Sequence, residues 1–286
     1  ASGGILGSAG GGLLGAALVK RVGTDNLLLL LVPALLLSVV IVQILLRRYR
    51  LSSRGRRGEH VPEEKNKRIK STLRTIRSER YLKLIVGLVA VSAIVGSIVG
   101  WQFDGVVQKA LVSKDRITGF QAMFQGLLSL FSFLLQISLG SRVVERWGVR
   151  VTVLMLPLAL LGGTTVLLLN PLRLWAAGLL RGSDGALRYS LDKASFELLY
   201  VPVEQSVRSE VKAVTDIVVN RFADGVGGIV LLIMTKVFGL GLSGVGLVNL
   251  VLIGLWLWVV IEARKEYVVV LLKNLGSRLE LSKSTI

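Results

Sequence analysis

Long apolar runs separated by short polar stretches dominate this chain. A helix needs roughly 20 residues to cross the hydrocarbon core of a bilayer, and eight segments reach or approach that length. They are 1–19, 27–46, 82–111, 120–140, 151–169, 174–201, 211–238 and 243–261. The composition, 52% hydrophobic and 19% charged residues, is also more apolar than that of a typical soluble domain. The pattern predicts an all-α integral membrane protein.

The basic residues predict an orientation. The stretch from Arg47 to Lys83 holds fourteen basic and four acidic residues, a net charge of +10 out of +17 for the whole chain. Because basic loops stay on the cytoplasmic side, we expect residues 47–80 and the C-terminus to be cytoplasmic. The same stretch is expected to lie near anionic lipid. Nucleic-acid binding is not expected, since Tyr49 and Tyr81 are its only aromatic residues.

Small residues follow a helical spacing in the first segment. The two rows are Gly3, Gly7, Gly11 and Gly15, and, one position further on, Gly4, Ser8, Gly12 and Ala16. Small residues let two helices in lipid approach closely, so we expect this segment to pack against another helix. The chain does not begin with Met, and its first segment lacks the basic start of a signal peptide. We expect an N-terminal truncation.

Several kinds of chemistry find no support. His60 is the only histidine and cysteine is absent, which argues against a metal or nucleophile site built on these residues. Gly239, Gly241 and Gly244 spell a dinucleotide-binding pattern, but no strand is predicted before them. No phosphate loop or nucleophile–base pair is visible. We therefore expect neither an enzyme nor a cofactor.

Charged residues at helical spacing mark the candidate site. A charged group at mid-bilayer costs at least ~2.5 kcal/mol, so such groups usually face a protein interior or a polar cavity. The two rows are Arg181, Asp184, Arg188 and Asp192 in one segment and Lys212, Asp216, Asn220 and Asp224, with Arg221 on a further side, in the next. Gln102 and Asp104 form a third candidate between Gly100 and Gly105, which weaken a helix. Either opposite charges staple the helices together, or surplus cations line a cavity for an anionic substrate.

The second charged row lies in a stretch that resembles a known family. The run YSLDKASFELLYVPVEQSVRSEVKAVTDIVVNRFADGVGG, residues 189–228, is similar to the nucleotide (ATP/ADP) translocase family. Residues 120–157, including RVVERWGVR, and the exit ARKEYVVVLLKNL resemble its bacterial subgroup, in which HEAT-type repeats often follow. The resemblance extends over residues 81–261. The chain differs from plant and parasite exchangers at two positions. They carry an acidic residue and a lysine where this chain has Gly100 and Gly225.

The resemblance implies a major-facilitator-type bundle of twelve helices, of which this chain holds about eight. Residues 1–46 would end the N-terminal half, 47–80 would form the cytoplasmic linker, 81–262 the six-helix C-terminal half and 263–286 the exit segment. The implied function is secondary transport of an anionic metabolite, such as ATP or ADP, across the bacterial inner membrane. The alternative is a membrane-anchored sensor or scaffold coupled to a cytoplasmic domain. The oligomeric state is left open.

Overall fold

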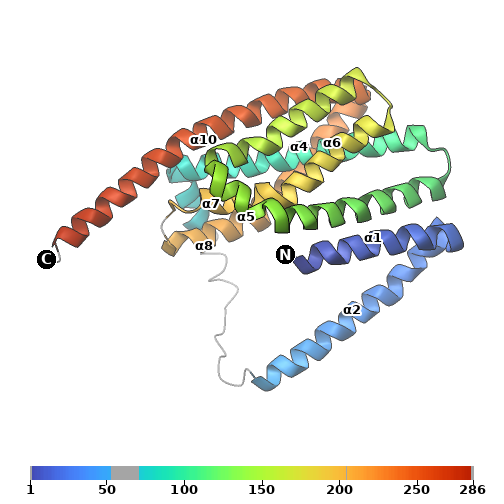
Figure 1. Ribbon diagram of the computed structural model, residues 1–286, viewed down its shortest axis with the longest axis horizontal. Coiled ribbons are helices and arrows are strands. Elements are labelled where there is room, and N and C mark those ends of the chain that lie inside the picture. The colour runs from blue at the N-terminus through green and yellow to red at the C-terminus, as the bar shows by residue number, and fades with distance from the viewer. Residues whose placement is uncertain (1, 53–70, 204, 285–286) are drawn as a thin grey trace.

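The computed structural model describes residues 2–52, 71–203 and 205–284, and every regular element in these ranges is a helix (Figure 1). Seven stretches in this part of the chain are long and apolar enough to cross a membrane. They are Gly3–Val22, Thr24–Arg47, Arg80–Ala110, Lys114–Ser138, Val151–Leu169, Val207–Val237 and Leu242–Leu272. The prediction of an all-α membrane protein is confirmed.

The sixth of the eight predicted segments is not among these seven stretches. It is divided into α6 (Leu174–Leu187), a π-helical turn η1 (Arg188–Asp192) and α7 (Lys193–Leu199). Arg181, Asp184 and Arg188 lie within its apolar run and lower its hydropathy. Its length still matches a membrane span, so charge content rather than length separates this segment from the other seven.

The chain runs back and forth between two ends of the bundle. Helices α1 (Ser2–Val22) and α2 (Thr24–Ser52) form a first hairpin, and α4 (Arg80–Ala110) then leads to α5 (Lys114–Leu169). The two predicted segments 120–140 and 151–169 are the two arms of α5. Its direction changes at Gly148, whose φ of 68° and ψ of 173° are open to glycine and strained for other residues.

The last third of the chain forms two long helical runs. Helices α8 (Gln205–Val214), η2 (Thr215–Val219), α9 (Asn220–Leu232) and η3 (Ile233–Val237) follow one another without a gap, and η2 and η3 are π-helical. Helix α10 (Leu242–Ser284) has 43 residues and is therefore about 65 Å long. Figure 1 shows it leaving the bundle as one uninterrupted helix, beyond the predicted span 243–261.

One of the two small-residue rows of α1 makes the expected close contact. A Cβ added at Gly12 would lie 2.7 Å from the Cα of Gly126 in α5. The Ser8 and Ser129 hydroxyls are 2.9 Å apart in the same contact. Gly3, Gly7 and Gly11 face open space instead. The helix presents one face to α5, so the row through Ser8 and Gly12 packs, with Gly15 beside it.

Helices α4, α6 and α10 and the second arm of α5 enclose the main core. Its fully buried side chains include Ile85, Leu88, Leu160, Leu180 and Trp256. Helix α4 continues unbroken through Gly100 and Gly105, so the weakening expected there is absent. An open helix would leave backbone groups unsatisfied in lipid. Gly105 instead admits a close neighbour, because an added Cβ would lie 2.9 Å from Leu242.

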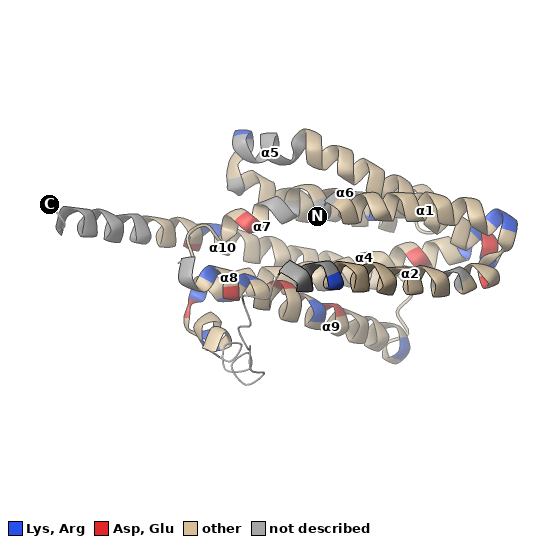
Figure 2. Ribbon diagram, turned by 90° about the horizontal axis from the view of Figure 1, so that it is seen from below, with Lys and Arg blue, Asp and Glu red and all other residues tan. Residues whose placement is uncertain are grey.

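Charged residues lie mainly near the ends of the helices, while α9 carries them further inward along the bundle (Figure 2). Arg80 at the start of α4 pairs with Glu262 and Glu266 of α10, so the two helices run antiparallel side by side. Most of the basic linker, residues 53–70, lies outside the described residues. The cytoplasmic placement of the linker and of the C-terminus stays a prediction.

Candidate functional site

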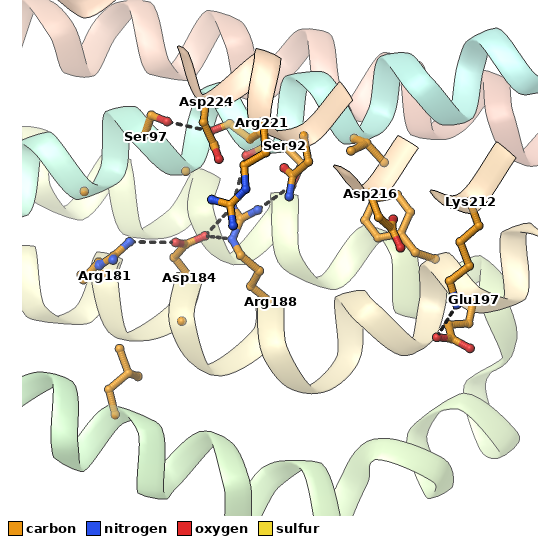
Figure 3. Close-up of a pocket in the computed structure, with 18 of the residues that line it drawn as sticks. Ser92, Ser97, Arg181, Asp184, Arg188, Glu197, Lys212, Asp216, Arg221 and Asp224 are labelled. Atoms are coloured by element: carbon orange, nitrogen blue, oxygen red, sulfur yellow. Dashed lines mark hydrogen bonds and ion pairs between the residues drawn. The ribbon is translucent and has the colours of Figure 1, made fainter. Parts of the chain in front are cut away.

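A cavity of about 850 Å³ opens between α4, α5, α6 with η1, and the α8–α9 run. Eight of the residues singled out from the sequence line it: Arg181, Asp184, Arg188, Lys212, Asp216, Asn220, Arg221 and Asp224. The two charged rows therefore face each other across one space, with α4 as the third wall (Figure 3).

The α6 wall is built around a single buried carboxylate. The Asp184 side chain is 3% exposed and accepts hydrogen bonds from two guanidinium groups. Arg181 donates from Nη1 at 3.2 Å, and Arg188 donates from Nη2 at 2.7 Å. The spacings i,i+3 and i,i+4 bring all three side chains to one helix face. Opposite charges within this row therefore pair with one another on the same helical run.

Arg188 is also tied to the neighbouring helix. Its Nη1 donates to the Ser92 hydroxyl at 2.8 Å, and its Nη2 donates to the Ser92 carbonyl at 3.2 Å. Gly96, one turn further along α4, makes the approach possible, because an added Cβ would lie 2.8 Å from Nη2 of Arg188. The guanidinium therefore cross-links η1 to α4 through Asp184 and Ser92.

The α9 wall is arranged differently. Within the described residues, Asn220, Arg221 and Asp224 make no side-chain hydrogen bond or ion pair. All three are exposed and line the cavity. In Figure 3 the Arg221 side chain points from α9 toward the α6 wall. This wall thus offers a guanidinium, an amide and a carboxylate with unused hydrogen-bonding capacity.

A more exposed ion pair lies at the end of the cavity nearest the α7–α8 turn. Lys212 Nζ is 2.8 Å from Glu197 Oε1, and these side chains are 38% and 53% exposed. Asp184 is almost completely buried, whereas this pair is more exposed, so side-chain exposure increases from Asp184 toward Glu197. Exposed pairs of this kind contribute little to stability.

Three of the predicted site residues do not contribute a described side chain to this cavity. Gln102 is 1% exposed and lies beside Thr164 and Asn249, whose Nδ2 is 3.5 Å from Gln102 Oε1 and 3.3 Å from Thr164 Oγ1. Asp104 is exposed and accepts a hydrogen bond from Gln121 at 2.8 Å. The side chain of Asp192 lies outside the described residues. Position on α4 explains the first two: Gln102 contacts Asn249 of α10 instead of facing the cavity, and Asp104 lies one turn beyond the lining residue Gly100.

The polar contribution of α4 to the cavity was not predicted from the sequence. Ser92 and Ser97 line the cavity, and Gly96 and Gly100 leave room for side chains from α6. Single serines and glycines in an apolar helix are common in membrane proteins, so no signal in the sequence separated these from ordinary packing residues. Glu197 was also left out of the candidate site.

The charge balance of the lining differs from the expected surplus of cations. Among the side chains that the structure describes, the basic ones are Arg181, Arg188, Lys212 and Arg221. The acidic ones are Asp184, Glu197, Asp216 and Asp224. Their formal charges cancel. The described lining therefore holds no surplus of cations.

Comparison with known families points to the same region. Residues 183–267 match a family model described as TLC ATP/ADP transporter. The match spans less than half of the chain, yet it covers α7, α8 and α9 and seven of the eight predicted residues that line the cavity. No curated protein and no solved structure matched this chain.

Two of the π-helical turns adjoin the cavity within the matched region. The first, η1, begins at Arg188, and the second, η2, contains Asp216. A π-turn inserts one residue into an α-helix and often occurs at functional sites. Both charged rows are therefore interrupted by a π-turn where they meet the cavity.

Proposed function

We propose that this chain works in a secondary membrane transporter of the ATP/ADP translocase-like type, which moves an anionic metabolite such as a nucleotide by alternating access. The cavity carries this proposal. It lies among helices of membrane length, charged residues from two of them line it, and the TLC ATP/ADP transporter match covers most of these residues.

The physical character of the cavity supports a small polar substrate. A volume of about 850 Å³ falls within the range of ligand pockets, roughly 300 to 1,000 Å³. Arginine is suited to phosphate because its planar guanidinium can donate two parallel hydrogen bonds. In the proposal, Arg221 with Asn220 and Asp224 binds the substrate, while Arg181 and Lys212 stay paired with Asp184 and Glu197. Intramembrane charges of this kind are expensive to keep and usually mark a transport route.

The proposal includes a membrane and an orientation. The protein would lie in a bacterial inner membrane, with residues 47–80 and the C-terminus on the cytoplasmic side, because these regions carry most of the excess positive charge. The Lys212–Glu197 end of the cavity would then open toward the cytoplasm. The lipid bilayer and the anionic substrate are the partners proposed.

A second candidate function has one observation in its favour. Helix α10 continues from Leu242 to Ser284 without a break, although a membrane span needs only about half of its 43 residues. A continuous helix can transmit motion from the bundle to whatever lies beyond it. A membrane-anchored sensor or scaffold would use the same cavity to bind a ligand and α10 to report it.

Uptake into vesicles tests the first candidate. The full chain is reconstituted, and labelled ATP, ADP and a panel of other organic anions are offered outside, with and without unlabelled substrate inside. We expect uptake of at least one anion. Arg221→Gln should reduce it, whereas Arg173→Gln, outside the cavity at the start of α6, should not. Binding without uptake or exchange would overturn transport and favour the sensor, and the absence of binding would overturn both.

A further inference from the structure

The distribution of charge within the cavity bears on which substrate it can accept. Four basic and four acidic side chains line the described part of the cavity, so this part of the lining is electroneutral. A strongly charged anion entering it would give up hydration without meeting a compensating excess of positive charge. Which substrate can bind therefore depends on which charged side chains have no partner within the protein.

Most of the basic side chains are already engaged. Arg188 donates to Asp184 and to both oxygen atoms of Ser92, and Arg181 shares the same carboxylate. Lys212 pairs with Glu197 at 2.8 Å. An anion that recruited any of these would leave a carboxylate without its partner. For Asp184, with a side chain only 3% exposed, that loss would be severe.

The groups without a partner lie together on α9. Within the described residues, Arg221 and Asp224 form no ion pair or hydrogen bond with other side chains, and they are three residues apart on the helix that faces α6. Residues at this spacing are neighbours on a helix surface. The site therefore offers a ligand one unpaired guanidinium, which can bind an anionic group, and one unpaired carboxylate, which can accept a hydrogen bond from a hydroxyl or amino group.

We propose that the cavity selects a singly phosphorylated metabolite, with nucleoside monophosphates favoured over the di- and triphosphates. This inference rests on the function proposed above and narrows its substrate class. One phosphate binds at Arg221, and a hydroxyl or amino group of the same molecule donates to Asp224. Each further phosphate adds negative charge that the engaged cations cannot balance, and it brings that charge near Asp216 and Asp224.

Equilibrium binding of AMP, ADP and ATP tests this selectivity. The full chain is placed in lipid nanodiscs made of neutral lipid, and labelled nucleotide is measured with EDTA present, so that no metal ion offsets the phosphate charge. We expect AMP to bind at least about tenfold more tightly than ATP, because like charges brought together in a binding site oppose association. Adenosine, which has no phosphate, should bind much more weakly than AMP.

The variant Asp224→Asn is expected to strengthen ATP binding, whereas a misfolded protein would bind ATP more weakly. The substitution removes one negative charge from the lining and keeps the side-chain shape, so ATP should bind more tightly and the preference for AMP should shrink. Asp25→Asn is the matched control, because Asp25 is exposed at the start of α2 and does not line the cavity. It should leave the preference unchanged.

The outcomes separate the two proposals. If ATP binds as tightly as AMP, or if Asp224→Asn changes the preference no more than Asp25→Asn does, the selectivity is overturned while nucleotide binding stands. If none of the three nucleotides binds, the proposed function itself falls and the selectivity falls with it. Tighter binding of AMP together with the predicted shift in Asp224→Asn supports both.

Discussion

The two charged rows look alike in the sequence and differ in the folded chain. The charged side chains of the α6 row are paired with one another. Asp184 is buried between Arg181 and Arg188, and Arg188 also donates a hydrogen bond to Ser92. The second row is unpaired only in its α9 part, where Arg221 and Asp224 have no partner among the described side chains. The first row therefore acts as a cross-link between helices, and the second is the better candidate for binding.

This difference separates stability from binding. Removing one member of a buried, paired group leaves a charge stranded, whereas removing an exposed and unpaired group leaves the remaining contacts intact. Variants on α6 should therefore affect folding first, and equivalent variants on α9 should affect ligand binding first. The four predictions below test that division.

The largest effect is expected for Asp184→Asn, which leaves Arg181 and Arg188 facing each other without their shared carboxylate. The free energy of unfolding should fall by about 3–5 kcal/mol, as for other buried pairs that lose one partner. Asp224→Asn is the matched control and should change it by less than about 0.5 kcal/mol. The measurement is the unfolding transition in mixed micelles, with monodispersity checked by size exclusion. Equal losses in the two variants would contradict the comparison.

The second prediction concerns the guanidinium groups. Arg221→Gln should leave the unfolding midpoint in place and weaken nucleotide binding by about tenfold or more, because an unpaired donor is lost from the open wall. Arg188→Gln should instead lower stability by about 1.5–3 kcal/mol, since charge-assisted hydrogen bonds to Asp184 and Ser92 disappear. Binding and unfolding are measured on the same preparations. If Arg221→Gln instead lowered stability and Arg188→Gln instead weakened binding, the binding site would be assigned to α6 rather than to α9.

A smaller effect should follow from filling the space beside Arg188. Gly96→Ala places a methyl group 2.8 Å from Nη2 of a guanidinium that four hydrogen bonds hold in position. Gly87→Ala, on the same helix, meets nothing within 4 Å. We expect Gly96→Ala to be less stable than Gly87→Ala by about 1–2 kcal/mol, because overpacking displaces the cross-link. Thermal unfolding of the pair measures it, and equal stability would show that Arg188 is loosely held.

The smallest effect is expected outside both rows. Gln102→Met keeps the volume of a buried side chain and removes its weak contact with Asn249, 3.5 Å away. Such interhelical hydrogen bonds in membranes average roughly 0.6 kcal/mol, so stability should change by less than about 1 kcal/mol. Nucleotide binding should not change, because Gln102 does not line the cavity. A clear loss of binding would return Gln102 to the candidate site.

Much of the architecture was accessible from the sequence because membrane helices obey strong local rules. The apolar runs, the two arms on either side of Gly148 and the close contact through Gly12 follow from hydropathy and small-residue spacing. The weakening of the helix expected at Gly100 and Gly105 is absent, and α10 is longer than the predicted span 243–261. In both cases the backbone keeps its hydrogen bonds by remaining helical, which residue propensities alone do not reveal.

The sequence by itself determined that charged residues lie on successive membrane-length segments, since their spacing fixes which ones share a helix face. The tertiary structure alone decided which of them are satisfied. Asp184 is closed off because Ser92 and Gly96 of α4, almost a hundred residues away along the chain, hold Arg188 in place. Arg221 is open because the described structure brings no acidic side chain to it. Spacing within one helix accounts for the ion pairs of Asp184, but the contacts of Arg188 with Ser92 and the unpaired state of Arg221 depend on distances between helices, about which that spacing carries no information.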